Sequence, residues 1–320
     1  MEREMERWAG RTAVITGGAS GFGLAAARLA AQQGMRVVLA DLQLQGAEAA
    51  AAELAASGAE VLALGVDVAD AADMERLRDA TLARFGVPHL VFNNAGVACG
   101  GFIWEHSLAQ WQWLLGVNLM GVVHGVRLFT PLMLAEAKRD PGYEGHIVNS
   151  ASMAGLLSLP NVGAYTVSKH AVVALSETLH QDLALVTDRV HASVLCPYAV
   201  PTGIAASQRL QAGRDPGIAS ATPSQQVAAA LAELSVSKGR VTAEEIAAKV
   251  FDAVRARQFY IYSHPQALGT VRTRMEDLLE GRNPSDPFAE KPALREQLLA
   301  ALAQAEADRD RSTGNEGAPG

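Results

Sequence analysis

The sequence predicts a three-layer α/β protein: a doubly wound parallel sheet of about seven strands with helices on both faces, followed by a C-terminal helical extension. Two observations predict this fold class. Short runs of β-branched and apolar residues recur along the chain, and Ala-rich segments with helical spacing lie between them. Strands that are apolar throughout are typical of parallel sheets buried on both faces.

The expected strands are the apolar runs taken in chain order. They are residues 12–16, 36–40, 60–64, 89–93, 146–150, 190–195 and 259–262. Two of the intervening segments, 23–33 and 45–57, have the Ala content and spacing of helices. Right-handed crossovers between parallel strands then place helices on both sides of the sheet.

Residues 1–265 are expected to form a single domain, because no linker or internal repeat divides the segment 10–265. The stretch 202–240 interrupts the alternation of strands and helices and is rich in Ala, Ser, Gln and Gly. An insertion of that length between two strands is typical of a lid or a flexible loop.

Residues 266–308 are expected to form the helical extension. Apolar residues recur on one helical face before Pro284 and on another after Pro287: Leu268, Val271, Met275 and Leu278, then Leu294, Leu298 and Leu302. The polar, Gly-containing end of the chain, 309–320, is expected to be a disordered tail.

Composition excludes several classes of protein. The 320 residues are 49% hydrophobic, and 27 basic against 34 acidic side chains give a net charge of −7. An acidic chain is not expected to bind nucleic acid. No apolar run reaches the roughly 18 residues that a membrane span needs, and the charged N-terminus does not resemble a secretory signal, so we expect a soluble, cytoplasmic protein.

The cysteines and histidines indicate neither a disulfide framework nor a metal site. Cys99 and Cys196 are the two cysteines and lie far apart, and the eight histidines include no HxxxH pair. This usage fits a reducing compartment. Cys99 falls in a loop expected near the substrate, but no neighbour in the sequence would activate a thiolate, so we interpret it as a packing residue.

A glycine loop follows the first expected strand and opens the first expected helix. In Thr16-Gly-Gly-Ala-Ser-Gly-Phe-Gly23, the glycines at 17, 21 and 23 permit a tight turn and let the backbone approach a pyrophosphate at the helix N-terminus. The simpler interpretation is a turn that only joins strand to helix. The strand–turn–helix context favours a dinucleotide site in a Rossmann-type fold.

Asp41 stands at the end of the second expected strand, 18 positions after Gly23. A carboxylate there is placed to accept hydrogen bonds from the adenosine ribose, and it would repel the additional phosphate of NADP. No Lys or Arg follows at 42–44 to neutralise that phosphate. NAD is therefore the expected cofactor, with NADP less favoured; the alternative is that Asp41 merely caps the next helix.

Tyr165 and Lys169 are the only Tyr-x-x-x-Lys pair in the chain, and in a helix they would share a face. A free phenol titrates near pH ~10. A neighbouring ammonium favours the phenolate, so we expect Lys169 to lower the pKa of Tyr165 and make it usable for proton transfer. Ser152 could orient the same substrate oxygen by hydrogen bonding. The alternative is a chance pair on a helix surface.

These motifs resemble the short-chain dehydrogenases/reductases over residues 8–265. The glycine loop is similar to the cofactor loop of that family. Asp67-Val68 resembles the segment that contacts adenine, and Asn93-Asn-Ala-Gly96 resembles the motif after the fourth strand. The family resemblance implies a homodimer or homotetramer, built on long helices near 104–129 and 165–185.

A catalytic tetrad is part of the same resemblance. Asn118 in Val-Asn-Leu is similar to the family's helical asparagine, and Ser152 rather than Ser150 lies thirteen positions before Tyr165, as in the family. The resemblance implies that Tyr165 is the acid/base and that Lys169 tunes it and contacts the nicotinamide ribose. Ser152 would then hold the substrate oxygen, and Asn118 would anchor a water in a proton relay.

Sixteen residues are expected to bind the cofactor. They are Gly17, Ser20, Gly21, Phe22, Gly23, Asp41, Asp67, Val68, Asn94, Ala95, Gly96, Tyr165, Lys169, Pro197, Val200 and Thr202. One departure from the family follows the sixth strand, where the usual Pro-Gly is Pro197-Tyr198. Because of this departure, the sequence does not predict the local loop geometry or the fit of the substrate. The expectation of hydride transfer is unaffected.

The substrate is expected between three loops at the carboxyl ends of the strands. The expected lining is apolar and comprises Phe102, Trp104, Met153, Leu159 and Tyr198, with Leu156 and Leu157 nearby. No Lys or Arg falls in 97–104 or 153–162 to bind an anion, so we expect a neutral, fairly hydrophobic secondary alcohol or its ketone. The alternative is that these side chains are simply core.

The expected function is an NAD-dependent oxidoreductase that interconverts such an alcohol and its ketone. Two alternatives stay open: a non-catalytic dinucleotide-binding sensor, and an isomerase or epimerase that retains NAD. A pure binder has no need of Tyr165 together with Lys169. The glycine spacing at 17, 21 and 23 differs from the Gly-x-x-Gly-x-x-Gly spacing typical of the isomerases.

Overall fold

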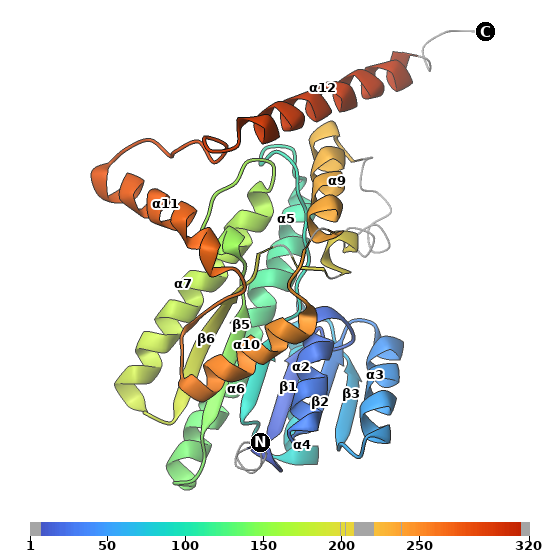
Figure 1. The fold of residues 1–320 in the computed structure, drawn as a ribbon. Coiled ribbons are helices and arrows are strands. Elements are labelled where there is room, and N and C mark those ends of the chain that lie inside the picture. Colours follow the sequence, from blue (N-terminus) through green and yellow to red (C-terminus); the bar gives the residue numbers. More distant parts are fainter. Residues whose placement is uncertain (1–7, 199, 202, 208–220, 238, 315–320) are drawn as a thin grey trace, which may run out of the picture.

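Seven parallel strands form one sheet at the centre of the molecule (Figure 1). The structure, a computed structural model, describes residues 8–198, 200–201, 203–207, 221–237 and 239–314. The strands are β1 (Thr12–Thr16), β2 (Arg36–Asp41), β3 (Val61–Gly65), β4 (Leu90–Asn93), β5 (Gly145–Ser150), β6 (Val190–Cys196) and β7 (Tyr260–Tyr262). Their spatial order is β3-β2-β1-β4-β5-β6-β7, and every neighbouring pair is parallel.

Helices cover both faces of this sheet, which confirms the predicted doubly wound α/β class. One face carries α2 (Gly21–Gln32), α3 (Leu44–Ala56) and α10 (Ala243–Ala256); the other carries α4 (Ala71–Phe85), α6 (Gly121–Arg139) and α7 (Gly163–Val186). Alternate strand residues serve the two layers: Ile15 packs with α2 and α10, whereas Val14 packs with α4 and α6.

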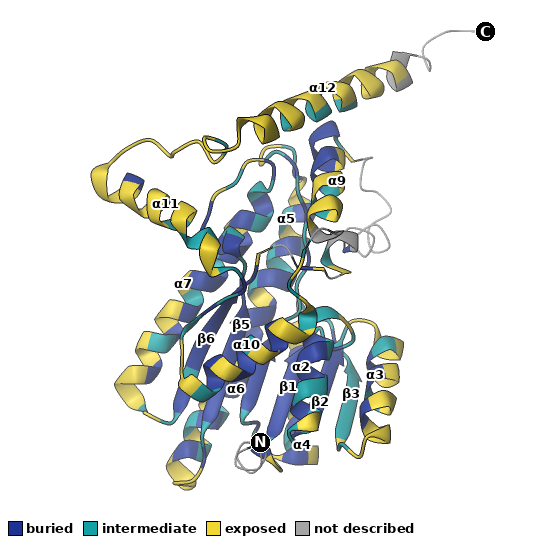
Figure 2. Cartoon of the chain, viewed as in Figure 1, coloured by how far each residue is buried: buried dark blue, intermediate teal, exposed yellow. Residues whose placement is uncertain are grey.

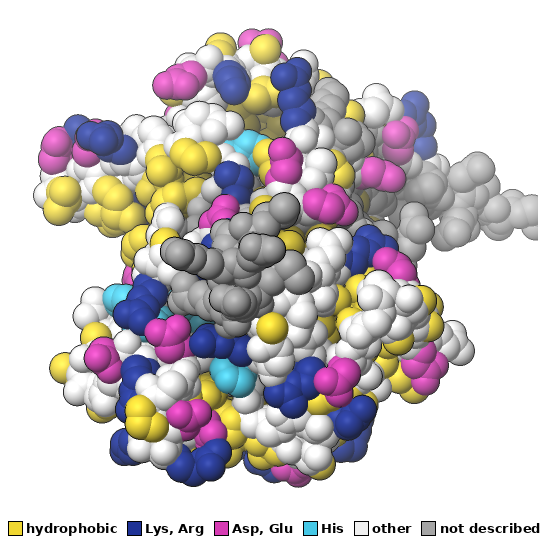
Figure 3. Space-filling view, turned by 60° about the horizontal axis from the view of Figure 1, so that its bottom comes forward, with side chains coloured by type: hydrophobic (Ala, Val, Ile, Leu, Met, Phe, Trp, Pro, Cys, Tyr) yellow, Lys and Arg dark blue, Asp and Glu magenta, His cyan; other side chains and the backbone are white. Residues whose placement is uncertain are grey.

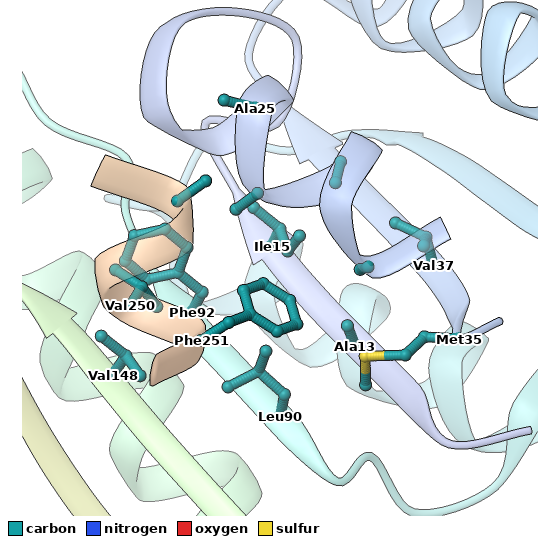
Figure 4. Packing of buried hydrophobic residues seen from close by; sticks show 14 of the residues in the cluster. Ala13, Ile15, Ala25, Met35, Val37, Leu90, Phe92, Val148, Val250 and Phe251 are labelled. Atoms are coloured by element: carbon teal, nitrogen blue, oxygen red, sulfur yellow. The ribbon is translucent and has the colours of Figure 1, made fainter. Parts of the chain in front are cut away.

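The core is dark blue in Figure 2, where the central strands and the inner helix faces are buried, whereas β3 is of intermediate burial. Figure 4 shows one half of it: Val250 and Phe251 of α10 lie against Phe92 of β4 and Ile15 of β1. Trp8 closes this layer with an edge contact to Phe251, at 5.6 Å between ring centroids. Because β1, β4 and β5 are buried on both sides, their carboxyl ends meet at a rigid edge that can hold a site.

One continuous helix, interrupted by a π-helical turn, crosses the sheet face that carries α4, α6 and α7. It consists of α5 (Leu108–Leu115), the π-turn η1 (Gly116–Met120) and α6. Its length and mean hydropathy of 1.4 would allow it to span a membrane, but half of that window is buried inside this protein. The burial is that of a core helix packed on a sheet, and the π-turn is a wider turn of the kind often found at functional sites.

The insertion at 202–240 contains regular structure where the chain is described. A 3₁₀ turn, η3 (Gly203–Ala206), is followed by helix α9 (Pro223–Ser237). The remaining residues of the predicted lid (202, 208–220 and 238) lie outside the described residues. Helix α9 stands over the same end of the sheet as α5, beyond the carboxyl ends of the strands (Figure 1).

The C-terminal extension follows the short turn η4 (Pro265–Ala267) and forms two helices, α11 (Leu268–Glu280) and α12 (Pro292–Gly314). Another short turn, η2 (Met153–Gly155), lies between β5 and α7. The tail boundary predicted at 309 is wrong, because α12 continues to Gly314. An Arg311–Asp308 ion pair at i, i+3 and hydrogen bonds from Gln304 to Asp308 stabilise the helix across the predicted boundary. Residues 315–320 of the predicted tail lie outside the described residues.

Candidate active site

The glycine loop between β1 and α2 is built for close backbone contact. Gly17 has φ +64°, which favours glycine. A Cβ added to Gly23 would lie 2.0 Å from the carbonyl oxygen of Gly17, so no larger residue fits there. The amide of Asn94, after β4, donates to the carbonyl oxygens of Thr16 (3.0 Å) and Gly17 (3.3 Å) and fixes the loop from the neighbouring strand.

Thr16 makes the matching contact in the other direction. Its hydroxyl accepts hydrogen bonds from the backbone N–H groups of Asn94 (3.0 Å) and Ala95 (3.1 Å). The loops after β1 and β4 are therefore held together at the point where the strand order reverses. That reversal is the switch point at which parallel α/β sheets bind their ligands.

A cavity of about 590 Å³ opens at this point, within the size range of small-molecule sites. Ten of the predicted cofactor residues line it: Gly17, Ser20, Gly21, Phe22, Asp41, Asp67, Val68, Asn94, Ala95 and Gly96. Gly23 lies beneath the cavity and does not line it, because its lack of a side chain serves the contact with the Gly17 carbonyl. The predicted adenine and glycine-loop segments are thus brought into one site.

Further residues of the lining were missed from the sequence. They are Ala19, Leu42, Gln43, Gly46, Val66, Val97, Trp113, Val117, Gly203, Ile204 and Ser207. Several of them, such as Leu42 and Val66, are immediate neighbours of predicted residues, and adjacency could have found them. Gly203 follows the predicted Thr202 in the segment expected to form a lid, whereas Trp113 carries no such signal, because only the tertiary fold brings it to the cavity.

The carboxylate of Asp41 is fixed at the end of β2 by two backbone hydrogen bonds. The N–H of Ala19 donates to its Oδ2 and the N–H of Gln43 donates to its Oδ1, both at 3.0 Å. The second bond closes the turn before α3 but does not cap the helix, because the N-cap residue is Gln43 and no side chain caps it. The Asp41 side chain lines the cavity. A fixed anion at this wall favours hydroxyl donors and opposes a phosphate.

Two residues of the predicted tetrad, Asn118 and Lys169, lie beside Gly96. The amide of Asn118, fully buried in the π-turn, accepts from the N–H of Val97 (2.8 Å) and donates to its carbonyl (2.9 Å) and to the Ser168 hydroxyl (3.0 Å). A Cβ on Gly96 would lie 3.4 Å from Asn118 Oδ1 and 3.5 Å from Lys169 Nζ. Asn118 and Lys169 therefore meet at the cavity's edge.

Lys169 is buried, with 2% of its surface exposed. Its ammonium donates to the carbonyl oxygen of Ser150 (2.8 Å) and lies 5.7 Å from the centroid of the Tyr165 ring. Burial lowers the pKa of Lys169 from 10.5 to about 8. It is thus still mostly charged at neutral pH, one helical turn from the phenol.

Burial raises the pKa of the Tyr165 phenol, and a hydrogen bond with Ser152 opposes that rise only in part. This is contrary to the expectation that Lys169 lowers the pKa. The ammonium donates to Ser150 instead of the phenol, and desolvation of the phenolate dominates. The choice of Ser152 over Ser150 agrees with this geometry, since the Ser150 carbonyl holds Lys169 while Ser152 faces Tyr165.

The segment after β6 has a mixed outcome. The carbonyl of Pro197 accepts from the N–H of Met153 (2.9 Å) and from the Ser152 hydroxyl (3.4 Å), so this turn supports the predicted tetrad. Val200 is 3% exposed and packs in the core with α10. Thr202 lies outside the described residues. Tyr198, the departure from the family pattern, is 48% exposed, and its N–H donates to Ser263.

The predicted substrate wall divides into exposed and core residues. Phe102 and Trp104 stack with ring centroids 4.8 Å apart, and Trp104 is 76% exposed. Met153 is 2% exposed and belongs to a core cluster that includes Leu156 and Leu157, with Leu159 packed against it. In this structure the second loop therefore contributes mainly packing, as the core alternative expected, and the first loop presents the aromatic surface.

Cys99 has a neighbour that the sequence did not indicate. His106 Nδ1 lies 3.6 Å from its sulfur, and the thiol itself is 2% exposed within a core cluster, where a packing residue is expected. The two residues are seven positions apart, and the loop folds back to bring them together. Both are buried, and burial lowers the pKa of His106, which keeps the imidazole neutral at pH 7.

The described residues contain no group that could hold a metal ion, and the face seen in Figure 3 carries charges of both signs. Among those residues, no group of three or more His, Cys, Asp or Glu side chains could hold a metal ion. Figure 3 shows one face of the molecule, on which Lys and Arg side chains alternate with Asp and Glu. A surface of mixed sign carries no electrostatic footprint for a polyanion on that face.

The fold and the cavity together define a class: a Rossmann-type α/β protein with a dinucleotide cleft at its switch point. Comparison with known proteins narrows this. The family described as short chain dehydrogenase matches residues 11–213, and the chain belongs to that family. It is therefore an oxidoreductase of the short-chain dehydrogenase/reductase class, as the motifs predicted.

Similar proteins agree with the assignment. A short-chain dehydrogenase/reductase from Burkholderia phymatum, solved in complex with NAD, is 47% identical, covers 88% of this chain and 98% of its own, and has a TM-score of 0.84. The 1-deoxy-11-beta-hydroxypentalenate dehydrogenase of Streptomyces avermitilis is 34% identical over 83% of this chain and 87% of its own. The cyclohexanol dehydrogenase of an Acinetobacter strain is 35% identical over 55% of this chain and 69% of its own. The first relative supports NAD(H) binding.

Proposed function

We propose that the protein is an NAD-dependent alcohol dehydrogenase/ketone reductase that uses Tyr165 as its general acid/base. The observation that carries the proposal is the convergence of Asn118 and Lys169 beside Gly96, at the edge of the dinucleotide cavity, with Tyr165 one helical turn from Lys169. A non-catalytic binder has no use for a buried ammonium whose pKa is lowered to about 8.

The residues present fit a dinucleotide. The glycine loop leaves room for no Cβ at Gly23, and Asp41 is held by Ala19 and Gln43 where ribose hydroxyls would donate to it. NAD, when bound here, accepts or supplies hydride at its nicotinamide ring. NAD is favoured over NADP because the Asp41 carboxylate would repel the additional phosphate.

The chain's own residues handle the proton. Because the pKa of Tyr165 is raised, its phenol is protonated near neutral pH and can donate to a ketone oxygen held by Ser152. The Lys169 ammonium, 5.7 Å from the ring centroid, stabilises the phenolate that this donation leaves. In the oxidative direction the same phenolate takes the alcohol proton, so oxidation is expected to gain from higher pH.

The proposed substrate is a neutral, fairly hydrophobic secondary alcohol or its ketone. Phe102 and Trp104 offer an aromatic surface, and segments 97–104 and 153–162 contain no Lys or Arg. Cyclohexanol, named for one relative, is a secondary alcohol of this kind, whereas the pentalenate named for another carries an acid group, so both kinds belong in a substrate screen.

The decisive test is Tyr165→Phe, with Tyr262→Phe as the control. Turnover is followed by the ultraviolet absorbance of the reduced nicotinamide, with neutral and anionic alcohols. Loss of a general acid/base is expected to lower kcat by about 100-fold or more while NAD affinity is unchanged. Full activity in Tyr165→Phe would refute the mechanism. Isomerisation of a substrate without net change in absorbance would favour the epimerase alternative.

We further propose a homodimer or homotetramer in the cytoplasm. Apolar side chains on the outer surface of the long helices support self-association: Val167 is 43% exposed, Leu185 84% and Val186 63%. Light scattering of the purified protein tests the assembly, and a monomer at micromolar concentration would contradict it. Fractionation of the source cells tests the location.

A further inference from the structure

The carboxylate of Glu105 joins the substrate loop to helix α9. Its Oε2 accepts hydrogen bonds from the hydroxyls of Thr222 (2.5 Å) and Ser224 (2.6 Å), which lie more than 110 positions away in the sequence. Hydrogen bonds to an ionised acceptor are short and about twice as strong as neutral ones. This contact is therefore a strong link between the loop at Glu105 and the start of α9, two segments that are far apart in the sequence.

The same carboxylate sits at the start of α9. The hydroxyl of Thr222 accepts from the N–H of Gln225 (3.3 Å), and the Gln225 side chain accepts from the N–H of Thr222 (3.1 Å), which is a capping box with Pro223 at the first helical position. An anion at this end of a helix is also favoured by the helix dipole. Glu105 thus fixes both the position and the first turn of α9.

The link continues from α9 back into the loops of the predicted active site. The Ser224 hydroxyl, which donates to Glu105, accepts from the N–H of Phe102 (2.9 Å), and the Ser224 carbonyl accepts from the Asn161 amide (3.2 Å). The Asn161 carbonyl in turn accepts from the N–H of Gly101 (2.9 Å). Ser224 and Asn161 are both buried, so these bonds are shielded from water.

Close backbone packing gives the assembly its rigidity. A Cβ on Gly100 would lie 2.4 Å from the Ala228 Cβ, and one on Gly101 would lie 2.6 Å from the Gln225 Cγ. Gly101 also has φ +128°, which few other residues adopt. Helix α9 therefore rests directly on the backbone of this loop, where no side chain could be added without moving it.

The assembly ends at the start of the helix that carries the phenol. Gly101 forms a parallel bridge with Val162, and α7 begins at Gly163 with Tyr165 in its first turn. Asn161, immediately before, is held at φ +63°, an uncommon value for a residue other than glycine. The contacts described above compensate for that conformation and set the direction from which α7 starts.

We propose that Glu105 is a positioning residue for the reaction: by clamping α9 onto the loop 100–105, it fixes the start of α7 and hence the phenol of Tyr165. It touches neither substrate nor cofactor in this role. The inference rests on the proposed function for its kinetic consequence, but the mechanical coupling stands on the contacts alone.

The test compares Glu105→Ala and Glu105→Gln with Glu290→Ala, a control at an exposed acidic residue. In Glu105→Ala, kcat is expected to fall tenfold or more, because misplacing a reacting group by about 1 Å can cost on the order of 100-fold. NAD affinity is expected to stay within about twofold, because the Asp41 and glycine-loop contacts are untouched. Glu105→Gln keeps an oxygen acceptor and is expected to recover most of the rate.

Hydrogen exchange of the backbone provides a readout that does not depend on turnover. Faster exchange is expected in Glu105→Ala at 222–228 and at 161–166, and not in the strands. Gly100→Ala, which displaces α9 from the other side, is expected to give the same pattern, with Gly269→Ala as a control because a Cβ there meets nothing within 4 Å.

The outcomes separate the two proposals. Unchanged kcat in Glu105→Ala, or faster exchange limited to α9 with 161–166 unaffected, would overturn the positioning role. If the wild-type protein oxidises no alcohol in the screen, the proposed function has failed, and the exchange at 161–166 still decides whether Glu105 fixes the start of α7. If Glu105→Ala does not fold, Gly100→Ala provides both readouts, and an unchanged kcat or unchanged exchange at 161–166 in that variant would overturn the positioning role.

Discussion

Replacing Lys169 with methionine is expected to stabilise the fold while it destroys activity. The side chain is 2% exposed, and burial lowers its pKa from 10.5 to about 8. Keeping the ammonium in the folded protein at pH 7 therefore costs about 3 kcal/mol relative to the unfolded chain. Methionine is similar in length and needs no solvation, but it leaves the Ser150 carbonyl without its donor, which costs about 1 kcal/mol. The net expectation for Lys169→Met is a gain of about 2 kcal/mol at pH 7.

The stability difference between Lys169→Met and the wild type is expected to decrease as the pH rises. The pKa of Lys169 is lower in the folded than in the unfolded state, so between pH 8 and 10.5 the unfolded chain binds more protons and the folded state gains stability as pH rises. The cost of the buried charge falls from about 3 kcal/mol at pH 7 to about 1 kcal/mol at pH 9.5. The advantage of Lys169→Met should thus narrow to about zero over that range.

Urea unfolding without added nucleotide, followed by the fluorescence of the four tryptophans, measures the difference at the two pH values. Leaving out nucleotide matters because a ligand of the folded state would stabilise the two proteins unequally. Lys138→Met, at an exposed lysine on α6, is the matched control and should change stability little at either pH. A loss of stability in Lys169→Met at pH 7, or a difference that does not narrow with pH, would refute the account of this lysine as a buried charge.

Two further predictions concern the cofactor cleft. Gly23→Ala should abolish measurable NAD binding, because its Cβ would lie 2.0 Å from the Gly17 carbonyl oxygen and the loop would have to open. A fluorescence titration with NAD measures the affinity, and the control Gly269→Ala should bind NAD normally. Asp41→Ala should lower the affinity for NAD about tenfold, which corresponds to the loss of one charge-assisted hydrogen bond. It should raise the affinity for NADP, because the like charge beside the additional phosphate is removed. Equal NAD affinity in the wild type and the variant, measured by calorimetry, would contradict the assigned role.

The sheet and the glycine loop could be predicted because each depends on local requirements. The interiors of strands β1, β2 and β4 are runs of apolar residues, and that pattern suits a strand covered on both faces wherever it lies in the chain. The glycines at 17 and 23 are required by positive φ and by backbone contact within a few residues. Asp41 is the last residue of β2, which neighbours β1, so its position at the carboxyl edge of the sheet follows from the strand order.

Parts of the site depend on contacts between distant residues, and there the sequence was insufficient or misleading. The Glu105–Thr222 bond joins residues 117 positions apart, and Trp113 and Ile204 reach the cavity from segments with no motif. The net pKa of Tyr165 is raised and not lowered as predicted, because burial of the phenol outweighs any neighbouring charge and spacing in a helix says nothing about desolvation.

By itself, the sequence determined the class of fold, the family and the residues that can carry the chemistry, because those follow from short-range periodicity, spacing and side-chain type. Only the tertiary structure decided how buried each of these groups is and what holds it. Burial sets the pKa values of Tyr165 and Lys169, and the contact between Glu105 and α9 sets the start of the helix that bears them both. Solvent exclusion and long-range contact are properties of the packed chain, and no local pattern encodes them.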